Sequence, residues 1–285
     1  MHPRNLQLHL AAVVLTINNQ SVLSELLLKI FNCHIRVCAL SGVIDASQSR
    51  AQYFISTNSQ AQPDWNIKAA IGNHTKYNVP TQGGFSGESF GDCELDYRWF
   101  IFKHDGSEIL KIIYQYPNPW ATIEAEILNH DVIINYIPGE NQTRVVIDPY
   151  TFPFSNLLYS QILNHWQGLL VHASGVMDGT DGYIFTAVSG TGKSTMAGLW
   201  AQKGSQIIND DIIAITTKDD ITIHNIPMPH YTDFPKSAPL KAIFIIKQSP
   251  NNYIKPQKRA FAAILLIANC IQQFGTPEYV RQHLA

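Results

Sequence analysis

The glycine-rich segment in the second half of the chain has the clearest chemical pattern. It runs Ala187-Val188-Ser189-Gly190-Thr191-Gly192-Lys193-Ser194-Thr195 and matches G-x-x-x-x-G-K-[S/T], with Ala187 in place of the first glycine. Small residues let successive backbone N–H groups surround a phosphate, and the positive end of a following helix adds to their attraction. We expect Lys193 to neutralise the β- and γ-phosphates of a nucleotide and Ser194 to place its hydroxyl on Mg²⁺, with Thr195 as the alternative ligand. The predicted nucleotide site comprises Ser189, Gly190, Thr191, Gly192, Lys193, Ser194 and Thr195.

Two adjacent carboxylates follow this segment after one expected helix and one expected strand. They are Asp210 and Asp211, at the end of the apolar run 206–209. An aspartate at the end of a strand beside a phosphate-binding loop is suited to hold Mg²⁺ directly or through water. Two carboxylates allow one to serve the metal and the other to accept a proton from an attacking hydroxyl. His172 lies on an earlier expected strand, and its position alone assigns it no role.

The elements around these residues predict a mixed α/β (α+β) second domain over residues 149–285. Apolar periodicity and Gly or Pro punctuation place helices at 155–167, 193–203 and 259–274. Strands are expected at 169–174, 183–188, 206–209, 212–216, 221–224 and 240–247. The turn residues 178–182 join the first two of these strands as a hairpin. Strands that alternate with helices favour a phosphate site at a strand-to-helix turn.

The first half, residues 1–148, is expected to be a strand-rich region that binds the acceptor or a partner. The predicted strands are 6–10, 34–40, 52–55, 64–71, 95–101, 109–116, 122–128, 132–137 and 143–147. Residues 21–31 have helical spacing with Ser21 as the N-cap, and the Gly- and Ser-rich stretch 82–92 is expected to be a loop. No chemical motif lies in this half.

Four features in one order resemble the catalytic domain of HPr serine kinase/phosphorylase, whose nucleotide site is similar to that of phosphoenolpyruvate carboxykinase. They are Val171-His172-Ala173, the hairpin, the glycine-rich segment and Asn209-Asp210-Asp211, and the resemblance covers residues 150–250. It implies transfer of the γ-phosphoryl group of ATP to a hydroxyl, with Mg²⁺. It also implies that Gly190, Gly192, Lys193 and Ser194 bind nucleotide and metal. By the same resemblance Asp210 is the proton acceptor, Asp211 the metal ligand, and His172 a neighbour of the transferred phosphoryl group.

Departures from that family leave the acceptor open. Residues 225–232 contain no acidic residue, whereas HPr kinases carry a Glu- and Gly-rich signature after the Asp pair. We therefore expect a serine of another peptide or protein, or a small-molecule hydroxyl, as acceptor. The alternatives are a catalytically silent nucleotide-binding module and a carboxykinase-like metabolic enzyme. Lys255, Lys258 and Arg259 could stabilise transition-state charge and His230 could line the acceptor pocket, although the sequence favours a solvated loop for both. The family continues further past its last helix, so we expect a short or truncated chain.

Composition excludes several other classes of protein. The 285 residues are 45% hydrophobic with a net charge of −2, which excludes disorder and offers no basic excess for nucleic acid. Four cysteines without a CxxC pair are typical of reduced thiols in a cytoplasmic protein. The apolar run 10–17 is too short to span a membrane. We expect a cytoplasmic protein that does not bind membranes; a homo-oligomer is compatible with these features.

Overall fold

The chain forms a strand-rich α/β structure with two compact units. The computed structural model describes residues 14–17, 20–23, 25–72, 75–88, 97–114, 120–138, 146–151, 154–229 and 234–271. Unit 1 comprises residues 1–29 and 33–149, and unit 2 comprises residues 30–32 and 150–285. The continuous part of unit 2 begins at Tyr150, next to the change in sequence pattern.

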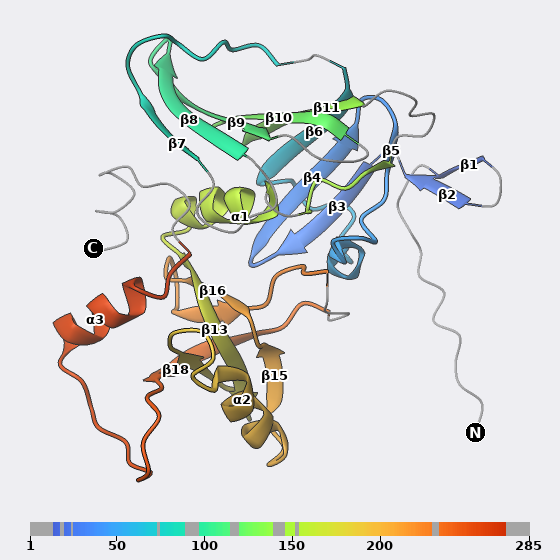
Figure 1. Ribbon diagram of the computed structural model, residues 1–285. Helices are drawn as coiled ribbons and strands as arrows, with labels where there is room; N and C mark the ends of the chain where they lie inside the picture. Colours follow the sequence, from blue (N-terminus) through green and yellow to red (C-terminus); the bar gives the residue numbers. More distant parts are fainter. Residues whose placement is uncertain are drawn as a thin grey trace, which may run out of the picture. The chain divides into compact units, whose positions relative to one another are not determined.

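Unit 1 contains two sheets (Figure 1). The smaller has the order β1-β2-β5-β12, formed by Val14–Ile17, Gln20–Leu23, Val43–Ile44 and Val146–Ile147. The larger has the order β3-β4-β6-β11-β10-β9-β8-β7, formed by Glu25–Ile30, Cys33–Ala39, Trp65–Ile71, Asp131–Pro138, Trp120–Leu128, Ser107–Tyr114, Tyr97–His104 and Phe85–Glu88. β4, β6 and β11 pair in parallel, and the strands from β11 to β7 pair antiparallel.

Three sequence predictions in unit 1 are wrong. The expected helix at 21–31 is replaced by β2 and β3, because Leu26, Leu28 and Ile30 alternate into the core with period two. The expected strand at 52–55 is a 3₁₀ helix, Ala51–Phe54, preceded by Arg50 in the left-handed conformation. Part of the expected loop at 82–92 is strand β7. The predicted strand at 6–10 lies outside the described residues.

A buried ionic cluster stabilises the larger sheet. The Lys111 ammonium lies 3.4 Å from a carboxylate oxygen of Glu126 and 3.4 Å from one of Glu124, and it donates a hydrogen bond to the Tyr77 carbonyl. Glu126 also accepts hydrogen bonds from the backbone N–H groups of Lys76 and Tyr77. Both Lys111 and Glu126 are buried, so each charge depends on these partners.

Unit 2 is built around the ten-residue strand β13, Leu169–Asp178. Pairing leads from β13 through β14 (Asp181–Thr186), β18 (Ser237–Ile245), β17 (Thr222–His224) and β16 (Ile212–Thr216) back to β13. β15, Gln206–Asn209, also pairs with β13. The core contains Val171, Ala173, Ile184, Ile208, Ile213, Ile215, Ile223 and Ala238. Among the described strands of unit 2, β14 and β18 pair in parallel and the other pairs are antiparallel.

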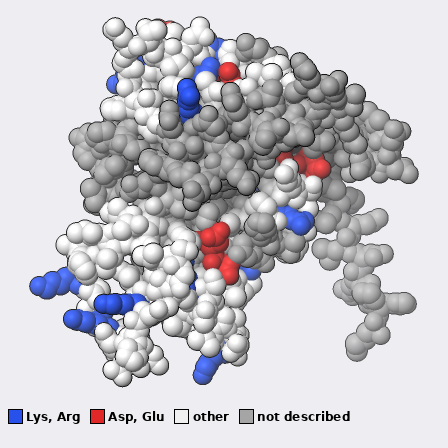
Figure 2. Space-filling model, viewed as in Figure 1, with Lys and Arg blue, Asp and Glu red and all other residues white. Residues whose placement is uncertain are grey.

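Three α-helices accompany these strands in the described part of unit 2. They are α1 (Phe154–His165), α2 (Lys193–Ala201) and α3 (Arg259–Ile267). The hairpin and the starts of all three helices agree with the sequence prediction to within one or two residues, but α3 ends well before residue 274. Lys and Arg side chains project around α3 and the segment before it (Figure 2). None of the described helices has both the length and the apolar composition needed to cross a bilayer.

Candidate functional site

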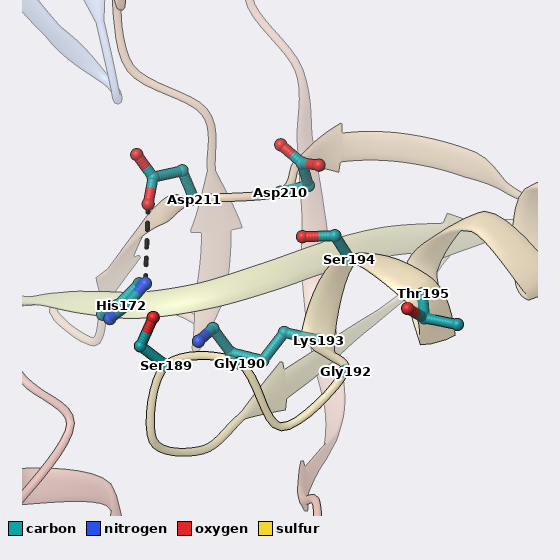
Figure 3. Close-up of a pocket in the computed structure, with 9 residues that line it drawn as sticks. All are labelled: His172, Ser189, Gly190, Gly192, Lys193, Ser194, Thr195, Asp210 and Asp211. Carbon is teal, nitrogen blue, oxygen red and sulfur yellow. Dashed lines mark ion pairs between the residues drawn. The ribbon is translucent and has the colours of Figure 1, made fainter.

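The predicted site residues line one cavity of about 430 Å³ in unit 2 (Figure 3). Its volume lies within the range of small-molecule pockets. The lining residues are His172, Ser189, Gly190, Gly192, Lys193, Ser194, Thr195, Asp210 and Asp211. Of the nucleotide, metal and catalytic residues that the glycine-rich motif, the acid pair and the family resemblance assign, only Thr191 is not among them. Three separate stretches of sequence therefore converge on one pocket.

Strand pairing explains this convergence. Ala173 on β13 lies opposite Thr186, the last residue of β14, so the loop that follows β14 starts beside His172. On another pairing of β13, Asn209 lies opposite Gly175 and Ile212 lies opposite His172. The same register holds on both sides of the acid pair. Asp210 and Asp211, which connect β15 to β16, therefore lie beside Ser174 and Ala173. The Ala173 N–H donates to the Asp211 carbonyl at 2.9 Å, as this register requires.

The glycine loop, residues 187–192, has a conformation that its sequence permits. Gly190 and Gly192 have φ of 77° and 112°, values that residues with a side chain rarely adopt. The Thr191 hydroxyl donates to the Val188 carbonyl at 2.7 Å, so Thr191 stabilises the loop from within. α2 begins directly after Gly192, and its first backbone N–H groups have no partner within the helix. This arrangement can bind an anion.

Lys193 brings a positive charge into the pocket. It is buried, and its ammonium donates to the Ala187 carbonyl at 3.2 Å, across the loop. Its side chain runs along the inside of the loop, below His172 in Figure 3. The hydrogen bond to Ala187 holds the ammonium where the loop would meet a phosphate group.

Asn209 fixes the turn that carries the acid pair. Its side-chain oxygen accepts the N–H of Asp211 at 2.9 Å and the N–H of Ile212 at 3.3 Å, and its amide nitrogen contacts the Met228 sulfur at 3.5 Å. The residue is buried. In addition, the Ser174 hydroxyl donates to the Asp210 carbonyl at 3.2 Å. The sequence reasoning missed the role of Asn209, although an Asn before a turn is a known signal for such bonds.

His172 faces Asp211 across the pocket. Its Nε2 lies 3.6 Å from Oδ1 of Asp211 (Figure 3). Burial lowers the pKa of His172, the positive charge of Lys193 lowers it further, and Asp211 acts in the opposite direction. The imidazole is therefore neutral at neutral pH and can exchange a proton with a group beside it. Asp210 projects at the Ser194 end of the pocket in the same view.

The oxygen atoms of the pocket suit Mg²⁺. Within the described ranges, no group of three or more His, Cys, Asp or Glu side chains could hold a metal ion by itself. The pocket instead offers the hydroxyl of Ser194 and the carboxylates of Asp210 and Asp211. Mg²⁺ prefers such oxygen ligands, and it is usually held by one or two carboxylates together with water and the phosphates of a substrate. The donor set therefore fits a Mg²⁺ ion that arrives with a nucleotide.

Other residues considered from the sequence do not line this pocket. Lys255, Lys258 and Arg259 are exposed and are not among its lining residues. His230 lies outside the described residues.

A scan of the sequence against protein-family models finds no match. A search of curated proteins likewise finds no match.

Proposed function

We propose that the protein is an ATP-dependent kinase that transfers the γ-phosphoryl group to a hydroxyl, with an HPr kinase-like nucleotide site in residues 150–250. The observation that supports this most is the shared pocket of a glycine loop, a buried lysine, a hydroxyl, two carboxylates and a histidine. Phosphoryl transfer requires positioning and neutralisation of charge more than covalent chemistry, and these groups supply both.

In this proposal the glycine loop and α2 hold the phosphates of ATP. The N–H groups of residues 189–194 donate to phosphate oxygens, and Lys193 offsets the charge that develops on the γ-phosphoryl oxygens. Bound Mg²⁺ neutralises phosphate charge as well. Ser194 and a carboxylate of the acid pair would hold the ion. As the acceptor oxygen bonds to the γ-phosphorus, the bond from that phosphorus to the ADP oxygen breaks, and the hydroxyl proton passes to the other carboxylate.

The geometry favours an exchange of the two aspartate roles that the family resemblance implies. Asp211 contacts His172, on the side away from Ser194, whereas Asp210 projects at the Ser194 end. We therefore propose Asp210 as the metal ligand and Asp211 as the proton acceptor, oriented by His172. Since a general base contributes about 10²- to 10⁴-fold, Asp211→Asn should cost about 3–5 kcal/mol of barrier and leave Mg²⁺-dependent ATP affinity nearly unchanged. Asp210→Asn should weaken the Mg²⁺ dependence of ATP binding; the opposite pattern would restore the original assignment.

A binding experiment tests the proposal directly. A fluorescent ATP analogue should bind the full chain in the presence of Mg²⁺, and Lys193→Met should weaken this binding at least tenfold. Lys203→Met is the matched control, because Lys203 is exposed two residues beyond α2 and does not line the pocket. Equal affinity in the Lys193 variant and the wild type would contradict the assignment.

A second measurement separates a kinase from the silent nucleotide-binding module. ATP labelled at the γ-phosphate is incubated with the protein, Mg²⁺ and pools of serine-containing peptides or small hydroxyl compounds. Transfer of label, or slow release of phosphate to water, supports the kinase. Nucleotide binding without either would favour the silent module.

A further inference from the structure

The chain carries its positive charge unevenly. Residues 234–277 contain six Lys or Arg and no Asp or Glu, although the whole chain has a net charge of −2. Two of these cations have partners in the fold: Lys236 donates to the Ile207 carbonyl, and Lys241 lies 3.6 Å from Asp181. Lys255, Lys258 and Arg259 are exposed and form no ion pair with any residue that the structure describes.

Apolar side chains are exposed beside these cations. Tyr253 and Ile254 are 71% and 80% exposed, and on α3 Phe261 and Ile264 are 52% and 61% exposed. Phe261 and Ile264 lie three residues apart and share one side of the helix. We call the exposed side chains of this stretch the basic–apolar face. They lie in the segment before α3 and in its first two turns, and they are Tyr253, Ile254, Lys255, Lys258, Arg259, Phe261 and Ile264. An exposed group of large apolar residues bordered by charge marks an interaction surface more often than a bare surface.

The end of α3 is bonded directly to the candidate site. The His172 N–H donates to the Asn269 carbonyl at 2.9 Å, and the Ile271 N–H donates to the Leu170 carbonyl at 2.8 Å. Because an α-helix rises 1.5 Å per residue, Ile264 lies about 8 Å and Phe261 about 12 Å from Asn269 along the helix axis. An extended peptide covers this distance in about three or four residues. A polypeptide on the basic–apolar face can therefore reach the His172 side of the pocket.

We propose that the basic–apolar face binds the acceptor, and that the acceptor is a polypeptide whose acidic and apolar side chains lie within a few residues of the phosphorylated hydroxyl. The inference rests on the proposed kinase function. The excess of cations favours an acidic partner, because opposite charges across an interface increase the association rate and select the partner. The same face of a second copy is a poor partner, since a two-fold contact would bring these cations against one another.

Peptide binding tests the proposal without requiring turnover. The probes are two fluorescein-labelled pools of 15-residue peptides with a central serine, one with Glu and Leu at the flanking positions and one with Lys and Leu. The full wild-type chain should bind the acidic pool at least tenfold more tightly than the basic pool, and added salt should reduce the difference. Equal binding of the two pools, or no binding of the acidic pool, would overturn the proposal.

Charge-reversal variants locate the binding surface. Lys255→Glu/Lys258→Glu/Arg259→Glu should weaken binding of the acidic pool at least tenfold, and Phe261→Ser/Ile264→Ser should weaken it several-fold. The matched control is Lys68→Glu/Lys103→Glu/Lys203→Glu, three exposed cations at other positions, which should change affinity less than twofold. An equal loss in the control would show that only net charge matters and would overturn the proposal.

Two further measurements exclude other occupants and separate this inference from the proposed function. The first measurement is sedimentation with phosphatidylserine vesicles. If the vesicles sediment the wild type but not the charge-reversal variant, and the wild type does not prefer either peptide pool, the face binds a membrane. A change of oligomeric state in the Phe261/Ile264 variant, again without peptide preference, would assign it to a second copy; both results overturn the proposal. Binding of the ATP analogue is measured in parallel. Its absence would refute the kinase, and with it the acceptor role, even if acidic peptides bind.

Discussion

Replacement of Asn209 by alanine should loosen the turn that carries both aspartates. The Asn209 side-chain oxygen accepts two backbone N–H groups, those of Asp211 and Ile212, and the residue is 1% exposed. A buried donor without a partner costs about 1–3 kcal/mol, so the loss of both bonds should cost about 2–6 kcal/mol of unfolding free energy. A displacement of about 1 Å at catalytic groups can lower a rate about 100-fold, so we expect turnover to fall by one to two orders of magnitude.

Urea unfolding and ATP-analogue binding at several Mg²⁺ concentrations together measure these effects. Asn209→Ala should lower the urea midpoint and shift the Mg²⁺ dependence of binding to higher concentration, because the Asp210 carboxylate is no longer held in place. Asn209→Asp keeps an oxygen acceptor of the same shape, but it buries a negative charge beside the acid pair, so it should remain less stable than the wild type. Asn252→Ala, at an exposed asparagine, is the control. If Asn209→Ala had the urea midpoint and Mg²⁺ dependence of the wild type, Asn209 would not position the acid pair.

Three further predictions concern other parts of the structure. Gly192→Ala should destabilise the loop by about 1–3 kcal/mol, because alanine rarely adopts the φ of 112° found here; steric contact adds nothing, since no atom lies within 4 Å of the added Cβ. We expect weaker binding of the ATP analogue and a lower melting temperature. An unchanged affinity and melting temperature would show that the loop relaxes without cost. Burial lowers the pKa of His224 to about 4, so below pH 6.5 the unfolded chain binds a proton that the folded one does not. Stability should therefore fall by about 2–3 kcal/mol from pH 7 to pH 4.5, and urea midpoints at the two pH values should show a smaller loss in His224→Gln. Lys111→Met leaves the buried Glu126 without its cation and should cost about 3–5 kcal/mol, whereas Lys111→Met/Glu126→Gln should recover much of it; equal unfolding midpoints for the two variants would contradict this account.

The sequence predicted the local elements of unit 2 well because their signals are local. Gly168 and Gly204 follow the ends of α1 and α2, and turn residues separate β13 from β14. The pattern of the glycine loop predicts a strand before it and a helix after it. The site residues follow from the same signals, since Lys193 and Ser194 belong to the loop pattern. The glycine-rich motif therefore identified six of the nine lining residues, the acid pair that follows it supplied two more, and His172 was added through the family resemblance.

The errors arise where two periodicities coexist or where pairing is distant. In residues 21–31 the apolar positions suit a helix, yet Leu26, Leu28 and Ile30 also alternate as a strand, and pairing within the larger sheet favours the second pattern. The pairing of the strands in unit 2 could not be predicted from the sequence. Short apolar strands do not reveal their partners, and β13 pairs with three of them.

Strand β13 is the reason that the site depends on the fold of unit 2 as a whole. At Ala173 it lies opposite the end of β14 and opposite the acid pair, and one residue earlier its backbone donates to Asn269 beyond α3. A shift of any one of these partners by a single residue would turn its side chains to the other face and remove its groups from the pocket. The glycine loop, the acid pair and the end of α3 are therefore coupled through two consecutive residues of one strand. Substitutions that alter pairing at this point should affect nucleotide binding and acceptor binding together, whereas exposed substitutions on α3 should affect only the second.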